Sequence, residues 1–141
     1  NPSGKLVGMD ISKAYMNYCS AGMNTGGFPF SAMPGVSALG SALGDILDKE
    51  SPSSALTAQK MAKEFDSCLA TFMSVNQTTI ITTAGLGPLI SELVDLLSKA
   101  NPSATMFCQG FATAVNNHAM AAIVSGLIPG APPVPFTGPI S

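Results

Sequence analysis

The chain has 141 residues, of which 46% are hydrophobic and only 10% are charged, and its formal net charge is −2. This length favours one domain that can bury a hydrophobic core. All six basic residues are lysines, and they are spread along the sequence. Binding to nucleic acid needs clustered positive charge, so the composition excludes nucleic acid as a partner.

Charged residues are unevenly distributed along the chain. None lies at 14–44, at 67–91 or after Lys99, whereas an average soluble domain has about 25% charged residues. A protein with so little charge usually covers its neutral surface with other subunits. We therefore expect a homo-oligomer or a larger assembly. A small monomer with a neutral surface rich in Ala, Ser and Gly is the alternative.

The first predicted helix covers about 11–23. Asp10 is a suitable N-cap, and the apolar residues that follow are spaced as on one face of a helix. Glycines end this helix. Two prolines prevent helix formation in the next segment, 24–35, which is predicted to be a loop.

The stretch from 35 to 123 is predicted to contain the same helical hairpin twice. Residues 35–73 align with 85–123 at a constant offset of 50 and without gaps. The alignment pairs Pro52-Ser53 with Pro102-Ser103 and repeats most apolar positions, as expected of a duplicated supersecondary unit. The four helices are predicted at about 36–49, 52–73, 88–100 and 102–127.

Residues 78–83 form a β-branched run that would suit a strand. An all-helical unit offers such a strand no partner. The run is therefore predicted to be an extended linker, or an edge strand that pairs with a neighbouring subunit.

The last segment, 128–141, contains five prolines, which favour an extended conformation over helix or regular sheet. Because the segment carries no charge, we expect it to lie on a neighbouring subunit, with packing against its own domain as the alternative. The last predicted helix has apolar residues on nearly every side and is expected to join it in assembly contacts. These predicted contacts are Ile128, Val134, Phe136, Ile140, Phe107 and Met120.

The predicted fold class is therefore all-α, with about five helices. A single helical domain at 1–127 contains the N-terminal helix and the two hairpin repeats, 35–73 and 85–123. An extended Pro-rich C-terminal arm at 128–141 follows it.

No catalytic, cofactor or metal site is predicted, and we expect that the protein is not an enzyme. His118 is the one histidine and is interpreted as a satisfied core or interface residue. The three cysteines are too far apart in sequence for a C-x-x-C site and are interpreted as buried, reduced thiols. Asp45 and Asp95 are equivalent in the two repeats and could face each other as paired carboxylates, but each lies in an exposed helical register.

The sequence shows no signal peptide and no apolar run of the roughly 20 residues that a bilayer span needs. This pattern disfavours a membrane as a partner. Reduced thiols also favour folding in a reducing compartment.

Two functions from different classes fit these observations. The first is a non-enzymatic structural subunit of a symmetric assembly, bound to copies of itself and to other subunits through the arm and the last helix. The second is a helical binding module for an apolar small ligand or a membrane surface, because eight methionines and seven phenylalanines could line an adaptable groove.

The compact helical body followed by the arm GLIPGAPPVPFTGPIS resembles small virion structural proteins of tailed bacteriophages. A chain that starts at Asn1 is also similar to a virion protein trimmed by a maturation protease. The resemblance implies a capsid, neck, tail or baseplate component that folds in the host cytoplasm and resides in the virion. It assigns no site residues.

Overall fold

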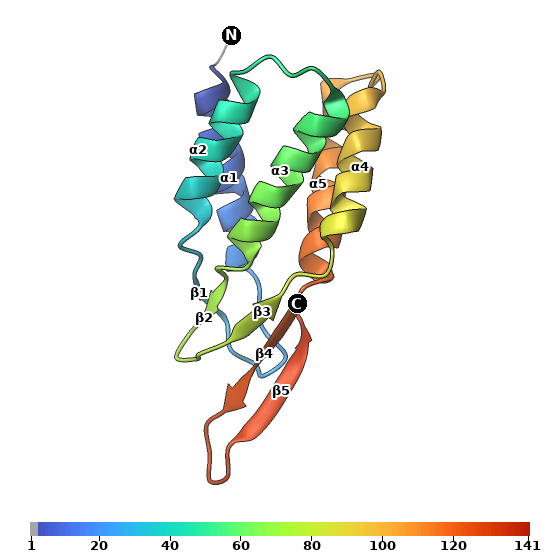
Figure 1. The fold of residues 1–141 in the computed structure, drawn as a ribbon. Coiled ribbons are helices and arrows are strands. Elements are labelled where there is room, and N and C mark those ends of the chain that lie inside the picture. Colours follow the sequence, from blue (N-terminus) through green and yellow to red (C-terminus); the bar gives the residue numbers. More distant parts are fainter. Residues whose placement is uncertain (1–2) are drawn as a thin grey trace.

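The structure, a computed structural model, describes residues 3–141, so Asn1 lies outside the described part. Five helices form one end of this part of the chain, and two small antiparallel sheets form the other (Figure 1). The helices are α1 Gly4–Ser20, α2 Val36–Leu47, α3 Ser54–Leu69, α4 Leu86–Ser98 and α5 Ala104–Met120. The strands are β1 Phe30–Ala32, β2 Met73–Ser74, β3 Ile80–Thr82, β4 Ile123–Ile128 and β5 Val134–Pro139.

The predicted all-α fold class is wrong, because the chain is mixed α/β. β1 pairs with β2, and β3, β4 and β5 form a second antiparallel sheet in the order β3-β4-β5. Strands β1, β2 and β3 have only two or three residues each, which is too short to show an alternating apolar pattern. Their pairing partners in other parts of the chain also leave no local signal in the sequence.

The predicted extended arm at 128–141 is a further error, because β5 pairs with β4 over six consecutive residues. The last helix is shorter than predicted and ends at Met120. The β-branched residues Ile123 and Val124 then begin β4, as their strand propensity favours. Prolines do not prevent this pairing, since a proline is tolerated at an edge strand where its nitrogen faces away from the partner.

The β-branched run at 78–83 is not a linker, because it has a strand partner in its own chain. Its central residues form β3, which pairs with β4 of the same chain in the register Ile80↔Ser125 and Thr82↔Ile123. The prediction failed because it treated the C-terminal segment as non-β and so left this strand without an internal partner.

The fifty-residue period extends over three units rather than two hairpins. The first helix of each unit begins at Gly4, Ser54 or Ala104. Each follows an N-cap serine, Ser3, Ser53 or Ser103, whose side chain accepts a hydrogen bond from a backbone N–H three residues later. The prediction of Asp10 as the first N-cap is therefore wrong, and it hid the first unit. The helices α2 and α4 are the second helices of the first and second units.

The strand pairing closes the three units into a ring. Ala32 of the first unit, which precedes α2, pairs with Met73 of the second unit, which follows α3. Thr82 of the second unit pairs in the same way with Ile123 of the third. Met23, which is fifty residues before Met73, exchanges two backbone hydrogen bonds with Ser141 at N···O distances of 2.7 and 2.9 Å. The third unit therefore pairs back onto the first.

Equivalent residues of the three units are buried just after the first helices. Asn24, Ser74 and Val124 are spaced by fifty residues and are each no more than 3% exposed. The Asn24 side-chain amide donates a hydrogen bond to Ser74 Oγ at 2.9 Å. A buried amide without a partner would be costly, so this bond fixes how the first two units meet.

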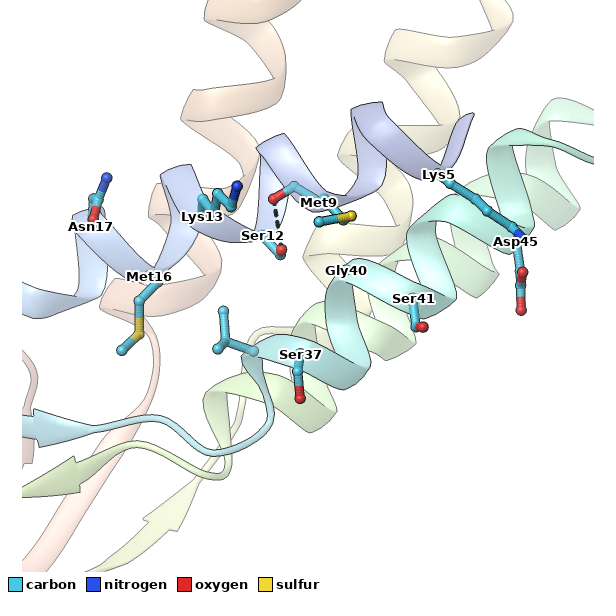
Figure 2. A pocket seen from close by; sticks show the side chains of 11 residues that line it. Lys5, Met9, Ser12, Lys13, Met16, Asn17, Ser37, Gly40, Ser41 and Asp45 are labelled. Atoms are coloured by element: carbon cyan, nitrogen blue, oxygen red, sulfur yellow. Dashed lines mark hydrogen bonds between the residues drawn. The ribbon is translucent and has the colours of Figure 1, made fainter. Parts of the chain in front are cut away.

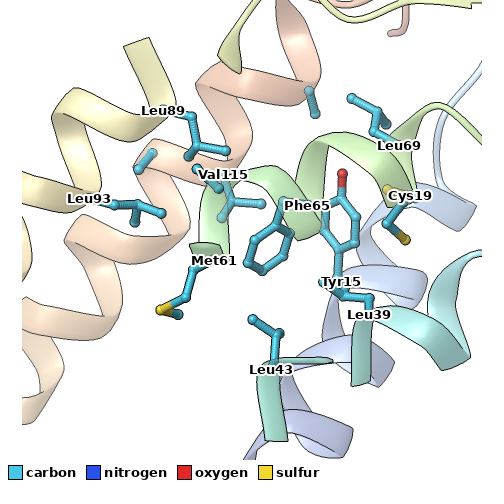
Figure 3. Close-up of a cluster of buried hydrophobic side chains, with 14 of the residues drawn as sticks. Tyr15, Cys19, Leu39, Leu43, Met61, Phe65, Leu69, Leu89, Leu93 and Val115 are labelled. Atoms are coloured by element: carbon cyan, nitrogen blue, oxygen red, sulfur yellow. The ribbon is translucent and has the colours of Figure 1, made fainter. Parts of the chain in front are cut away.

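The hydrophobic core lies among the three first helices, with α2 and α4 packed outside them (Figure 1). The Phe65 ring of α3 makes edge contacts with Tyr15 of α1 and Phe111 of α5, with ring centroids 5.1 and 5.8 Å apart. Leucines four residues apart on α2 and α4 complete the core: Leu39, Leu43, Leu89 and Leu93 (Figure 3). Burying each of them contributes about 1.5–3 kcal/mol.

The α1 and α2 backbones approach each other very closely. A Cβ atom at Gly8 would clash with the Gly44 nitrogen and would lie 2.6 Å from the Gly40 carbonyl oxygen. Gly40 and Gly44 are themselves buried, so the contact has no flexible side chain that could move aside. This close packing fixes α1 against α2.

We predict that Gly8→Ala lowers the free energy of unfolding by about 1–3 kcal/mol, because the added methyl group forces the two backbones apart. Ser41→Ala is the matched control, because Ser41 lies at an exposed position on α2. It should change the free energy of unfolding by less than about 0.5 kcal/mol. Urea unfolding followed by circular dichroism measures both changes, and equal stability of Gly8→Ala and the wild type would contradict the close packing.

Candidate functional site

A cluster of polar side chains around the buried His118 joins α3, α5 and the segment before α4. His118 is 2% exposed, and its Nε2 lies 2.8 Å from Asp66 Oδ1. The Thr83 hydroxyl donates to the other carboxylate oxygen of Asp66 at 3.0 Å. The carboxylate can only accept hydrogen bonds while it is ionised, so Nε2 carries the proton in this contact.

This cluster lacks the connectivity of a nucleophilic triad. In a triad the hydroxyl bonds to the imidazole, whereas here the Thr83 hydroxyl bonds to Asp66. The second ring nitrogen of His118, Nδ1, is buried without a hydrogen-bond partner. The cluster therefore ties the second unit to the third, and it explains why this histidine lies on the core side of α5.

The equivalent carboxylates Asp45 and Asp95 do not form a site. Both are exposed, and Asp95 forms an ion pair with Lys99 at 2.5 Å on the surface of α4. An exposed pair of this kind contributes about 0–1 kcal/mol. In the described residues 3–141, no group of three or more His, Cys, Asp or Glu side chains is placed to hold a metal ion.

A shallow groove of about 580 Å³ runs along the outer side of α1 and α2 (Figure 2). Met9 and Met16 of α1 lie on one side, and the Lys5 side chain extends towards Asp45 of α2. Ser12 donates its hydroxyl hydrogen bond to the Met9 carbonyl oxygen. None of the residues that line this groove is a histidine or a cysteine.

Two of the three thiols are buried in the core. Burial raises the pKa of the Cys19 thiol to about 11, and the same desolvation raises the pKa of the Cys68 thiol to about 12. Both thiols are therefore protonated at neutral pH and chemically inert. Cys108 is exposed on α5, so the prediction of a buried thiol is wrong for this residue.

One face of the β3-β4-β5 sheet, which extends away from the helices, exposes apolar side chains (Figure 1). Residues that are paired across antiparallel strands share a face. The pairs Ile80↔Ser125↔Thr137 and Leu127↔Pro135 place five residues on one side. We call Ile80, Ser125, Leu127, Pro135 and Thr137 the outer sheet face. Ile80 is 72% exposed and Leu127 is 52% exposed.

The outer edge of β5 is unsuited to pairing with another strand. Pro135 and Pro139 have no N–H, so their nitrogens face away from β4 towards this edge. The N–H of Ser141 faces the same edge, because Ser141 is two residues after Pro139. It donates a hydrogen bond to the Met23 carbonyl oxygen. The outer edge of β5 thus has few donors for a further strand.

The six predicted assembly contacts have different surroundings. Val134 and Met120 are exposed, at 55% and 60%. Phe136 contacts the chain's own Gly26 and Gly126, and Ile140 contacts Gly22. Phe107 stacks on Phe111 of the same helix, and Ile128 is half-buried in β4. For Phe136 and Ile140 the structure shows the alternative, packing against their own domain.

The sequence analysis missed Ile80 and Leu127, which are the most exposed apolar residues of the outer sheet face. A usable signal was present in the prolines, because Pro133, Pro135 and Pro139 are all at odd positions. Prolines that alternate in this way indicate an edge strand whose nitrogens face outward.

Comparisons with protein-family models, with curated proteins and with solved structures find no match to this chain. None of the helices in the described part, 3–141, is both long enough and apolar enough to cross a membrane.

We predict that Asp66→Ala lowers the free energy of unfolding by about 1–3 kcal/mol, because it leaves the buried His118 ring without a partner. Asp45→Ala is the matched control on an exposed aspartate and should change stability by less than about 0.5 kcal/mol. Thermal and urea unfolding measure both. Equal effects of the two substitutions would contradict the role given to the buried cluster.

We also predict that iodoacetamide modifies one thiol in the native protein at pH 8 and three after unfolding in urea. Cys108 should react first, because it is exposed, whereas Cys19 and Cys68 are buried with raised pKa values. Mass spectrometry of the alkylated peptides identifies the site. Fast native modification of Cys19 or Cys68 would show that the core opens readily.

Proposed function

We propose that this protein is a non-enzymatic structural subunit of a symmetric assembly and that its outer sheet face makes the contacts between subunits. The observation that carries the proposal is this exposed, uncharged, apolar face on a hairpin that extends away from the helical bundle (Figure 1). The sequence has no charged residue after Lys99, so the face has no charge of its own to keep it in water.

The energetics support contact through side chains. Covering Ile80 and Leu127 would each contribute up to about 1.5–3 kcal/mol, depending on how much of the side chain becomes buried. Ser125 and Thr137 hydrogen-bond to each other at 3.0 Å, so only one of their two hydroxyl hydrogens still needs a partner in an interface. The polar cost of burying the face is therefore limited to that one group.

A phage virion is the assembly that the resemblance of the helical body and the C-terminal segment to small virion proteins favours. The prolines at the edge of β5 fit this setting, because a subunit that is made in many copies must avoid uncontrolled pairing of strand edges. The proposal needs no catalytic residue, and the buried Asp66–His118 cluster then acts only in stability.

We predict that the wild type forms a defined multimer and that Leu127→Lys reduces it to smaller species. A buried lysine on the outer sheet face would have no carboxylate partner, so its desolvation opposes association. Light scattering over a range of protein concentrations measures the mass, and circular dichroism checks that the helix content is unchanged.

Leu6→Lys is the matched control, because Leu6 is 55% exposed and lies on α1, away from the sheet. It should leave the multimer intact. The proposal is contradicted if the wild type is a monomer at every concentration, or if both substitutions dissociate the multimer equally.

A further inference from the structure

An open groove lies between α1 and α5, and no helix covers it in the described part of the chain. The α2 helix contacts both α1 and α3, and the α4 helix contacts both α3 and α5. Each second helix therefore packs against the first helix of its own unit and the first helix of the next. Because the three units close into a ring, the position between α5 and α1 is the third equivalent one.

We propose that this groove binds an amphipathic helix of a partner protein, one whose inserted face is uncharged and carries leucines four residues apart, as in α2 and α4. The inference goes beyond the assembly proposal and concerns a different surface. It stands on the repeat and on the residues that line the groove.

Small residues at one set of positions show where the second helix packs on each first helix. On α1 the residues are Gly4, Gly8 and Ser12, and Gly8 contacts α2 directly. The equivalent residues on α3 include Ala58 and Ala62, which are both fully buried. The equivalent residues on α5 are Ala104, Cys108 and Ala112, and all three are exposed. α5 thus keeps the small surface for a helix that none of the helices in residues 3–141 supplies.

The groove itself has the apolar, uncharged character of a helix-binding site. It is about 230 Å³ in volume, and its lining residues include Ile11 and Ala14 of α1, Ala112 and Val115 of α5, and Phe65 at its base. No charged residue lines it. A helix face with charged side chains would lose their hydration there without gaining a partner, so an uncharged face is the complement.

At the end of the groove near the sheets, the third unit offers the equivalent of a contact that the residues before α2 and α4 make. Gly35, which precedes α2, packs against Thr71, and Gly85, which precedes α4, packs against Ala121. The third equivalent residue is Ala21, which lines an adjoining hollow of about 330 Å³ together with Ile140 and Ser141. A docked helix would therefore begin here with a small residue and run in the same direction as α2 and α4.

The test uses a synthetic peptide of residues 83–100, which contains α4, added to the full chain. The peptide should bind with one copy per chain and shield Cys108 from iodoacetamide. We expect the alkylation rate of Cys108 to fall about tenfold when the peptide is at about ten times its dissociation constant. A control peptide with Leu89→Asp and Leu93→Asp should have no effect.

Two variants of the full chain locate the binding site. Ala112→Glu places a charge in the groove at an exposed position and should abolish the protection, whereas Ala38→Glu, at an exposed position on α2, should not. Leu127→Lys should leave peptide binding unchanged, so failure of the groove and failure of the outer sheet face are distinguished. Unaltered Cys108 alkylation at saturating peptide would overturn the proposal. So would a wild-type dimer that Ala112→Glu dissociates, because a second copy would then be the occupant.

Discussion

The fold depends on how the three units meet between the helices and the sheets. Asn24 and Ser74 share a buried hydrogen bond there, and Val124 occupies the third equivalent position. A donor and an acceptor in this place allow only one arrangement of the first two units, because any shift leaves a buried polar group unpaired. The strand pairs that start beside these residues then set the spacing of the helices, and the helices bury the core.

The interfaces between first helices use the same positions with different chemistry. Asp66 of α3 binds His118 of α5, and the equivalent residues Asn116 of α5 and Tyr18 of α1 hydrogen-bond at 2.5 Å. One contact joins a carboxylate to an imidazole and the other joins a phenol hydroxyl to an amide oxygen, although both join one unit to the next. The units have therefore diverged in side chains while they keep the same geometry.

The helices were largely predictable from the sequence because their apolar periodicity is local. The fifty-residue offset placed α2 and α4 correctly, since Gly35 and Gly85 precede both helices at equivalent positions.

The strands were not predictable in this way. β1 to β3 are two or three residues long, and their stability comes from partners in other units. The prediction of Asp10 as the N-cap concealed the true N-cap, Ser3. The repeat was therefore counted as two copies, and the first of the three units was missed. The open groove between α1 and α5 can be recognised only when all three units are compared, so it was not predicted from the sequence.

The backbone hydrogen bonds between Met23 and Ser141 also affect how the protein unfolds. In an open solenoid, each repeat contacts only its neighbours, and the terminal repeats can fray independently. Here the first unit contacts the third as well as the second, so loss of either terminal unit breaks two interfaces rather than one. The pairing joins residues that are 118 positions apart in the sequence, so closing it costs more chain entropy than forming a local contact does. Opening of one unit is thus coupled to opening of the others, and unfolding should be all-or-none.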